Sequence, residues 1–207
     1  IVSGPPTCQS PRSTGLLAEF FYFKGDLRMM PDLLYDKPAI SRVDMVVNYA
    51  QTSAHWAGVH RRDVFAARWT GAIYIKQGGK YRFDTQSDDG SFLWIDGRVV
   101  VSNPGVHGPR TIYRTTTMKA GWHTIMATIF ENRGGANMFL RYLGPDTNYH
   151  HVIVPTEVLR PAKKNANKLT RPMGTPNNAH YYRYPDQSTL LRRGSKVYLL
   201  ATVRAKN

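Results

Sequence analysis

Residues 82–101 constrain the fold more than any other part of this 207-residue chain, because they predict three short strands joined by two tight turns. Tyr81, Phe83 and Thr85 alternate with charged residues, and this period of two is typical of a half-buried strand. Asp96-Gly97 separates two runs rich in β-favouring residues. A two-residue turn there needs positive φ angles, which Asp and Gly tolerate best. The run therefore predicts consecutive antiparallel strands.

The composition favours strands and turns over helices. The chain has 17 Gly, 13 Pro and 12 Tyr, together with many Val, Ile and Thr residues. A chain of this length has room for one core, or for one domain with a long tail. No apolar run approaches the roughly 20 residues of a membrane-spanning helix. Cys8 is the single cysteine, which excludes an internal disulfide.

The order of motifs resembles that of the PA14 domain, a β-sandwich module of toxins, glycosidases and yeast adhesins. The clearest part is a Gly-x-x-Tyr-Arg-Phe strand, then Ser-Asp-Asp-Gly, then Leu-Trp-Ile-Asp-Gly, over residues 78–97. Further segments resemble the family's opening strand, the strand before the acidic turn, a later strand and the Gly-rich bend after it; they are residues 15–21, 68–75, 121–125 and 131–136. The resemblance implies an all-β fold, a PA14-like antiparallel β-sandwich or barrel.

Domain boundaries follow from the resemblance and from the uneven charge. We expect a Pro-rich leader over residues 1–14, the PA14-like domain over residues 15–155, and a basic linker or extension over residues 156–207 that is irregular or begins another domain. The net charge is +14, from 28 basic and 14 acidic residues. From residue 156 onward there are 11 basic and 2 acidic residues, which gives +9 and leaves +5 for the rest. The extension therefore carries most of the imbalance.

The extension combines cations with tyrosines, which predicts contact with an acidic partner surface. Its Pro-, Asn- and Lys-rich start buries too little apolar surface to fold alone. Interleaved Arg and Tyr can also stack bases and neutralise phosphates, but no nucleic-acid-binding fold surrounds them, so nucleic acid is not the expected partner. The predicted partner-binding residues are Lys163, Lys164, Lys168, Arg171, Tyr181, Tyr182, Arg183, Tyr184, Arg192 and Arg193.

The acidic turn at Asp88-Asp89-Gly90 has two interpretations. In one, it is a hairpin bend whose Asp side chains bond the local backbone while Gly supplies an unusual φ. In the other, two carboxylates offer the hard oxygen ligands that Ca²⁺ prefers. Neighbouring side chains on an extended strand point to opposite faces, so shared chelation needs an unusual backbone, such as a cis peptide bond between the two Asp residues.

The resemblance to lectin-like PA14 domains supports the second interpretation, since a paired-Asp motif in that branch holds Ca²⁺, which in turn binds sugar hydroxyls. Two acids do not complete a shell of six to eight oxygens. By family analogy Asn132, in the loop of residues 131–137, is the third expected metal ligand, although Arg133 brings a positive charge nearby. His107 lies in a turn-rich loop and is either a ligand-binding residue or a histidine bonded locally.

No catalytic constellation is visible in the sequence, which has no phosphate-binding Gly loop and no nucleophile elbow. Glu131 and Asp89 could stand in for a pair of glycosidase carboxylates, yet PA14 modules attached to glycosidases are accessory pieces. We therefore expect no enzyme activity. The leading hypothesis is a glycan-binding module of an extracellular or cell-surface protein. The alternative is a structural subunit of a homo-oligomer or larger assembly inside the cell, held to acidic neighbours by the basic extension.

The strand pattern also predicts which side chains form the core. Apolar residues at β-favouring positions are expected to be buried, and they are Phe83, Leu93, Ile95, Trp122, Ile125, Ile129 and Leu140.

Overall fold

The computed structural model describes residues 14–33 and 36–162, and nearly all of its regular structure is β-strand. One sheet contains β1 (Leu16–Tyr22), β2 (Ile40–Asp44), β4 (Phe65–Ile75), β6 (Ser91–Ile95), β7 (Arg98–Asn103), β9 (Gly121–Glu131) and β12 (Leu159–Pro161). The other contains β3 (Asn48–Thr52), β5 (Gly79–Asp88), β8 (Arg110–Met118), β10 (Ala136–Leu143) and β11 (Val152–Ile153). Two short 3-10 turns, η1 (Pro145–Thr147) and η2 (Thr156–Val158), lie near the end of the described chain.

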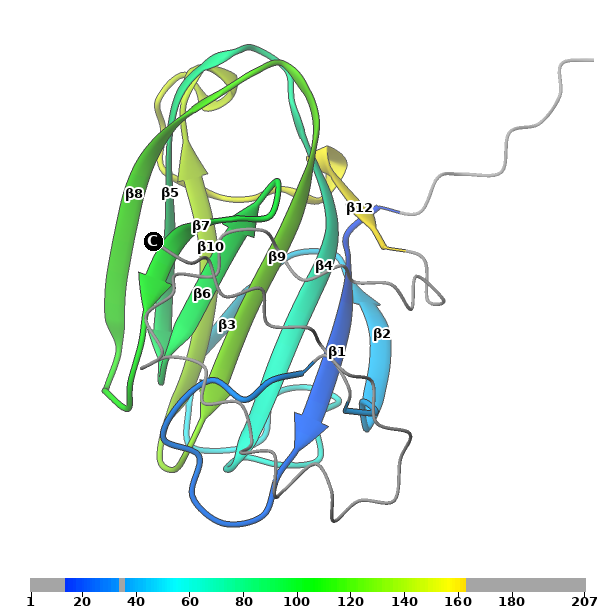
Figure 1. The fold of residues 1–207 in the computed structure, drawn as a ribbon, viewed down its shortest axis with the longest axis vertical. Coiled ribbons are helices and arrows are strands. Elements are labelled where there is room, and N and C mark those ends of the chain that lie inside the picture. The colour runs from blue at the N-terminus through cyan, green and yellow to red at the C-terminus, as the bar shows by residue number, and fades with distance from the viewer. Residues whose placement is uncertain (1–13, 34–35, 163–207) are drawn as a thin grey trace, which may run out of the picture.

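The two sheets form the layers of an antiparallel β-sandwich (Figure 1), which confirms the predicted fold. The larger sheet has the order β2-β1-β4-β9-β6-β7, with β12 added to β4. The smaller sheet has the order β11-β10-β5-β8, with β3 added to β10. Consecutive strands β5 and β6 belong to different sheets, so the acidic turn between them is where the chain crosses from one layer to the other.

Alternating side chains fill the space between the sheets. On β5, Tyr81 and Phe83 are fully buried in the main core, as the period of two predicts. The predicted turn at Asp96-Gly97 is also confirmed, with φ angles of 49° and 73°. Six of the seven predicted core residues are buried in this cluster, namely Phe83, Leu93, Ile95, Ile125, Ile129 and Leu140.

The prediction for Trp122 was wrong, because its side chain is 41% exposed. On β9 the buried positions Ile125, Ala127 and Ile129 all have odd numbers and point between the sheets. Trp122 has the opposite parity, so it points to the outer face of the larger sheet. The alternation along β9 therefore places Trp122 outside the core despite its aromatic character.

A second apolar cluster covers part of that outer face. Phe92 and Trp94 of β6 and Phe130 of β9 pack there with Met30 and Leu33 from the segment that follows β1. This cluster explains why all five residues of β6 are buried, although a strand with one solvated face normally alternates. The end of the larger sheet that leads to the acidic turn is therefore buried on both faces.

The sandwich also extends past the boundary predicted at residue 155, since β12 pairs with β4 through Leu159, Arg160 and Pro161. Within the described ranges, no helix has the length and apolar character needed to cross a membrane.

Candidate metal centre

The site forms where three strand ends meet at one end of the sandwich. Asp88 is the last residue of β5, Asp89 follows it in the crossing to β6, and Glu131 is the last residue of β9. Because β6 pairs with β9 from Ser91↔Ile129 onward, and the Phe130 amide donates to the Gly90 carbonyl oxygen at 2.9 Å, the acidic turn lies beside Glu131. The peptide bond between Asp88 and Asp89 is cis.

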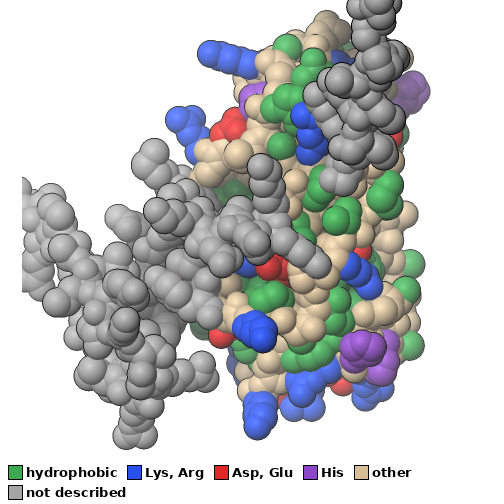
Figure 2. All heavy atoms as spheres, turned by 90° about the vertical axis from the view of Figure 1, so that its right-hand side faces the viewer, with side chains coloured by type: hydrophobic (Ala, Val, Ile, Leu, Met, Phe, Trp, Pro, Cys, Tyr) green, Lys and Arg blue, Asp and Glu red, His purple; other side chains and the backbone are tan. Residues whose placement is uncertain are grey.

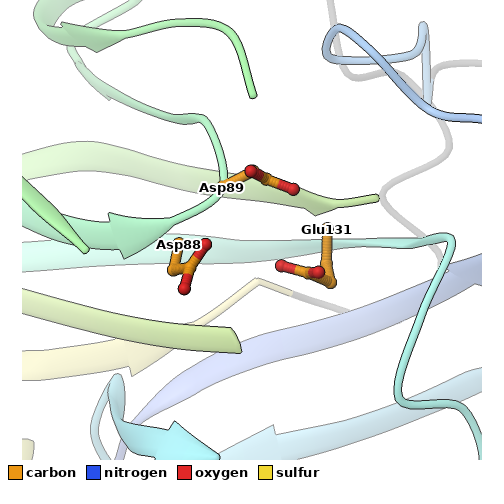
Figure 3. Close-up of side chains that lie close together, drawn as sticks. All are labelled: Asp88, Asp89 and Glu131. Atoms are coloured by element: carbon orange, nitrogen blue, oxygen red, sulfur yellow. The ribbon is translucent and has the colours of Figure 1, made fainter. Parts of the chain in front are cut away.

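The side chains of Asp88, Asp89 and Glu131 lie close together (Figure 3). One oxygen from each of Asp88, Asp89 and Glu131 lies within 4.8 Å of the other two, and all three residues are buried. Oxygens that share one Ca²⁺ at 2.3–2.6 Å can be at most about 5 Å apart. The spacing is therefore compatible with a single calcium ion between them.

Donors from β3 and from two neighbouring loops hold the two aspartates. Asp89 Oδ1 accepts the backbone N–H of His107 at 2.7 Å, and its Oδ2 accepts the backbone N–H of Asn132 at 2.8 Å. Asp88 Oδ2 accepts the Gln51 side-chain amide at 2.9 Å. Each of these carboxylate oxygens keeps a further lone pair. The hydrogen bonds therefore orient the carboxylates and leave them able to bind a cation.

Glu131 is the most deeply buried of the three acids, and its charge has less hydrogen-bond support than the charges of the aspartates. Its side chain is 0% exposed, and neither carboxylate oxygen has a hydrogen-bond partner in the part of the chain that the structure describes. Burial, reinforced by the nearby Asp89, Asp88 and Asp63 carboxylates, raises the pKa of Glu131 to about 9, and the backbone N–H of Asp89 offsets only part of this rise. Burial also raises the pKa of Asp88 and of Asp89. A buried polar atom without a partner costs free energy, and a bound cation would satisfy all three groups at once.

Gly90 is required for this packing. A Cβ at Gly90 would lie 2.5 Å from Cε1 of the Phe130 ring and 2.9 Å from the Gly105 carbonyl oxygen. Only a residue without a side chain lets the turn lie against the end of β9 and the loop of residues 104–109.

The predicted site residues have different positions around this centre. Asp88 and Asp89 are brought together. The Asn132 side chain points elsewhere, since its Oδ1 accepts the Leu27 N–H at 2.9 Å, so its role as a metal ligand stays a prediction. His107 contributes its backbone N–H, while its ring Nε2 is buried and has no partner among the described residues.

The Arg133 guanidinium pairs with Asp26 at 3.1 Å, and its side chain is 64% exposed. Glu131 was not predicted as a metal ligand, although it continues the odd-numbered inward series of β9, where an acid is unexpected. The partner-binding residues predicted between 163 and 193 lie outside the described residues, and their role stays a prediction.

Comparison with known proteins decides the family. The PA14 domain family matches residues 12–135, which is more than half of the chain. The chain belongs to the PA14 domain family. No curated protein sequence matches it.

Solved structures agree on the fold. An anti-sigma factor domain-containing protein aligns with a TM-score of 0.62 at 19% identity, over 73% of this chain and 49% of that one, so the chain spans about half of that protein. The PA14 sugar-binding domain from an RTX adhesin aligns with a TM-score of 0.62 at 16% identity, over 72% of this chain and 99% of that one. The epithelial adhesin 6 A domain from Candida glabrata, solved in complex with Galb1-3GlcNAc, has a TM-score of 0.52 at 13% identity, over 77% and 92% of the two chains. At these identities the similarity shows a shared fold.

Proposed function

We propose that this PA14 domain is a non-catalytic glycan-binding module whose binding depends on Ca²⁺ held by Asp88, Asp89 and Glu131. The observation that carries the proposal is the Glu131 carboxylate, fully buried beside two other carboxylates and without a hydrogen-bond partner among the described residues. An acidic cluster is common on protein surfaces. A fully buried carboxylate such as Glu131, with other carboxylates beside it and no cation nearby among the described residues, is rare, because unpaired charge in the interior is costly.

The three carboxylates would supply hard oxygen ligands from two strand ends and one turn, which suits Ca²⁺ better than softer metals. When bound, the ion would offer its remaining coordination positions to sugar hydroxyls. Asp88 is the most exposed of the three residues, at 7%, so a ligand would approach from its side. The exposed Gln51, which donates to Asp88, lies on this approach. Gln51 and Asp88 are therefore the residues closest to an incoming saccharide.

Two of the structural neighbours support the ligand class, since one is described as a sugar-binding adhesin domain and the other was solved with a disaccharide. Their adhesin descriptions also support a surface or extracellular location for this protein.

A glycan array tests the proposal. The purified chain should bind a subset of glycans in 1 mM CaCl₂ and lose that binding in EDTA. Glu131→Gln should lose it in both buffers, because an amide oxygen is a weaker calcium ligand than a carboxylate. Glu157→Gln, which changes an exposed glutamate of η2, is the matched control and should bind as the wild type does. Glycan binding that is equal in calcium and in EDTA would contradict the proposal.

A further inference from the structure

Two aromatic side chains stand together on the outer face of the larger sheet, near its other end. Tyr74 on β4 and Trp122 on β9 are direct cross-strand partners. Their ring centroids are 5.1 Å apart with the planes tilted by 44°. Tyr74 is 37% exposed and Trp122 is 41% exposed. Exposing this much aromatic surface is unfavourable in water, so the pair requires an explanation.

A cation completes the group. The Arg160 guanidinium lies 4.0 Å from the Trp122 ring centroid, within the range of a cation–π contact. The Arg160 guanidinium makes no hydrogen bond or ion pair with the side chains or backbone of residues 14–33 and 36–162. Among these residues nothing occupies its five N–H donors, so they can bind an acidic group beside the rings. Trp122 keeps its exposed surface even with the guanidinium against it.

The size of this surface favours a small ligand. An aromatic side chain carries roughly 150–250 Å² of surface, so two rings at about 40% exposure offer on the order of 150–200 Å². A stable protein interface needs about 800 Å² on each partner. The neighbouring positions of the same face hold the small Ala72 and the exposed Thr124, which do not extend the apolar area. The surface matches one sugar ring and is far too small for a protein partner.

We propose that Tyr74, Trp122 and Arg160 form a second saccharide-binding surface, specific for an acidic sugar. The C–H face of a pyranose ring packs on the two aromatic rings, and the sugar carboxylate accepts hydrogen bonds from Arg160. The inference takes its ligand class from the proposed glycan binding and adds to it both a second position and a charge preference.

The two sites are independent in space. Trp122 and Glu131 belong to the same strand, β9 (Gly121–Glu131), near its opposite ends. At about 3.3 Å per residue, they are roughly 30 Å apart. Calcium at the carboxylates therefore makes no contact with a sugar on the aromatic pair, and saccharide binding there does not need calcium.

NMR of the indole N–H groups tests this directly. The chain has four tryptophans, and only Trp122 is exposed; the others are Trp56, Trp69 and Trp94, at 5%, 0% and 2%. Trigalacturonate, titrated in EDTA, should shift the Trp122 indole resonance. Its fully methyl-esterified form should bind roughly tenfold more weakly, because the charge-assisted hydrogen bond to Arg160 is lost.

Variants assign the binding surface. Tyr74→Ala and Arg160→Gln should each weaken trigalacturonate binding by roughly tenfold. Tyr113→Ala is the matched control, because Tyr113 is another exposed tyrosine, on β8 of the smaller sheet, with the Arg82 guanidinium 5.0 Å from its ring. This variant should bind as the wild type does.

Three other outcomes are possible. No shift of the Trp122 resonance, or unchanged affinity in both Tyr74→Ala and Arg160→Gln, would overturn the inference. Binding that appears only in calcium and disappears in Glu131→Gln would place the ligand at the carboxylates and also overturn it, while supporting the proposed function. A third outcome is calcium-independent binding at Trp122 with no calcium-dependent binding on the glycan array. It would support the saccharide surface of Tyr74, Trp122 and Arg160 and contradict the proposed calcium-dependent site.

Discussion

Glu131→Gln tests whether the buried Glu131 carboxyl holds a proton when no cation is bound. In metal-free protein the pKa of Glu131 is raised by burial from 4.5 to about 9. The folded state therefore holds a proton on this carboxyl that the unfolded chain releases above about pH 4.5. Stability from this group is complete below that pH and is lost progressively as the pH rises toward 9.

The expected size follows from linkage. A one-proton difference between the two states changes the free energy of unfolding by about 1.4 kcal/mol per pH unit. Between pH 5.5 and pH 8 the metal-free wild type should lose on the order of 3 kcal/mol from this residue. Glutamine has the same shape and no proton to release, so the variant should lack this part of the slope, whatever its absolute stability.

Urea unfolding in EDTA at several pH values measures the difference, with Glu157→Gln as the control that should retain the wild-type slope. Added Ca²⁺ should stabilise the wild type at pH 8 by about 2.7 kcal/mol at a hundredfold excess over its dissociation constant, and should leave Glu131→Gln unchanged. If the free energy of unfolding in EDTA has the same pH dependence in wild type and in Glu131→Gln, then Glu131 does not hold a proton in the folded state.

Two pairs of substitutions test the packing. Trp69→Ala, at a fully buried position of the main core, should cost about 3–5 kcal/mol of stability. Trp122→Ala should cost about 1 kcal/mol or less, because its side chain is 41% exposed. Equal losses of stability in thermal melts would place both rings in the core. Gly90→Ala should cost about 1–3 kcal/mol, because its Cβ would lie 2.5 Å from a phenylalanine ring. Gly108→Ala, where a Cβ meets nothing within 4 Å, should be close to neutral, and a Gly90→Ala melt as high as that of Gly108→Ala would contradict the close packing of the turn.

The fold was predictable because its signals are local. The alternation along β5 and the Asp96-Gly97 turn are both read from a few consecutive residues, and both are confirmed by burial and by φ angles. The end of the domain, expected at residue 155, was harder to predict. The short strand β12 is held mainly by its pairing with β4, and such long-range pairing leaves little trace in three residues of sequence.

The acidic site was predictable only in part, because it is assembled from distant segments. Asp88 and Asp89 are adjacent, so the sequence shows them together. Glu131 joins them only through the pairing of β6 with β9, and its sole local sign is an acid in the inward series of Ile125 and Ile129. The same parity along β9 would have placed Trp122 on the outer face.

Anomalous diffraction from a crystal grown in calcium chloride shows whether the three carboxylates bind Ca²⁺. We predict a calcium peak between Asp88, Asp89 and Glu131, with carboxylate oxygens from all three at about 2.3–2.6 Å. The Glu131→Gln crystal should lose the peak under the same conditions. A wild-type map with no peak at this position, or with the ion bound to other residues, would contradict a calcium centre built on these three carboxylates.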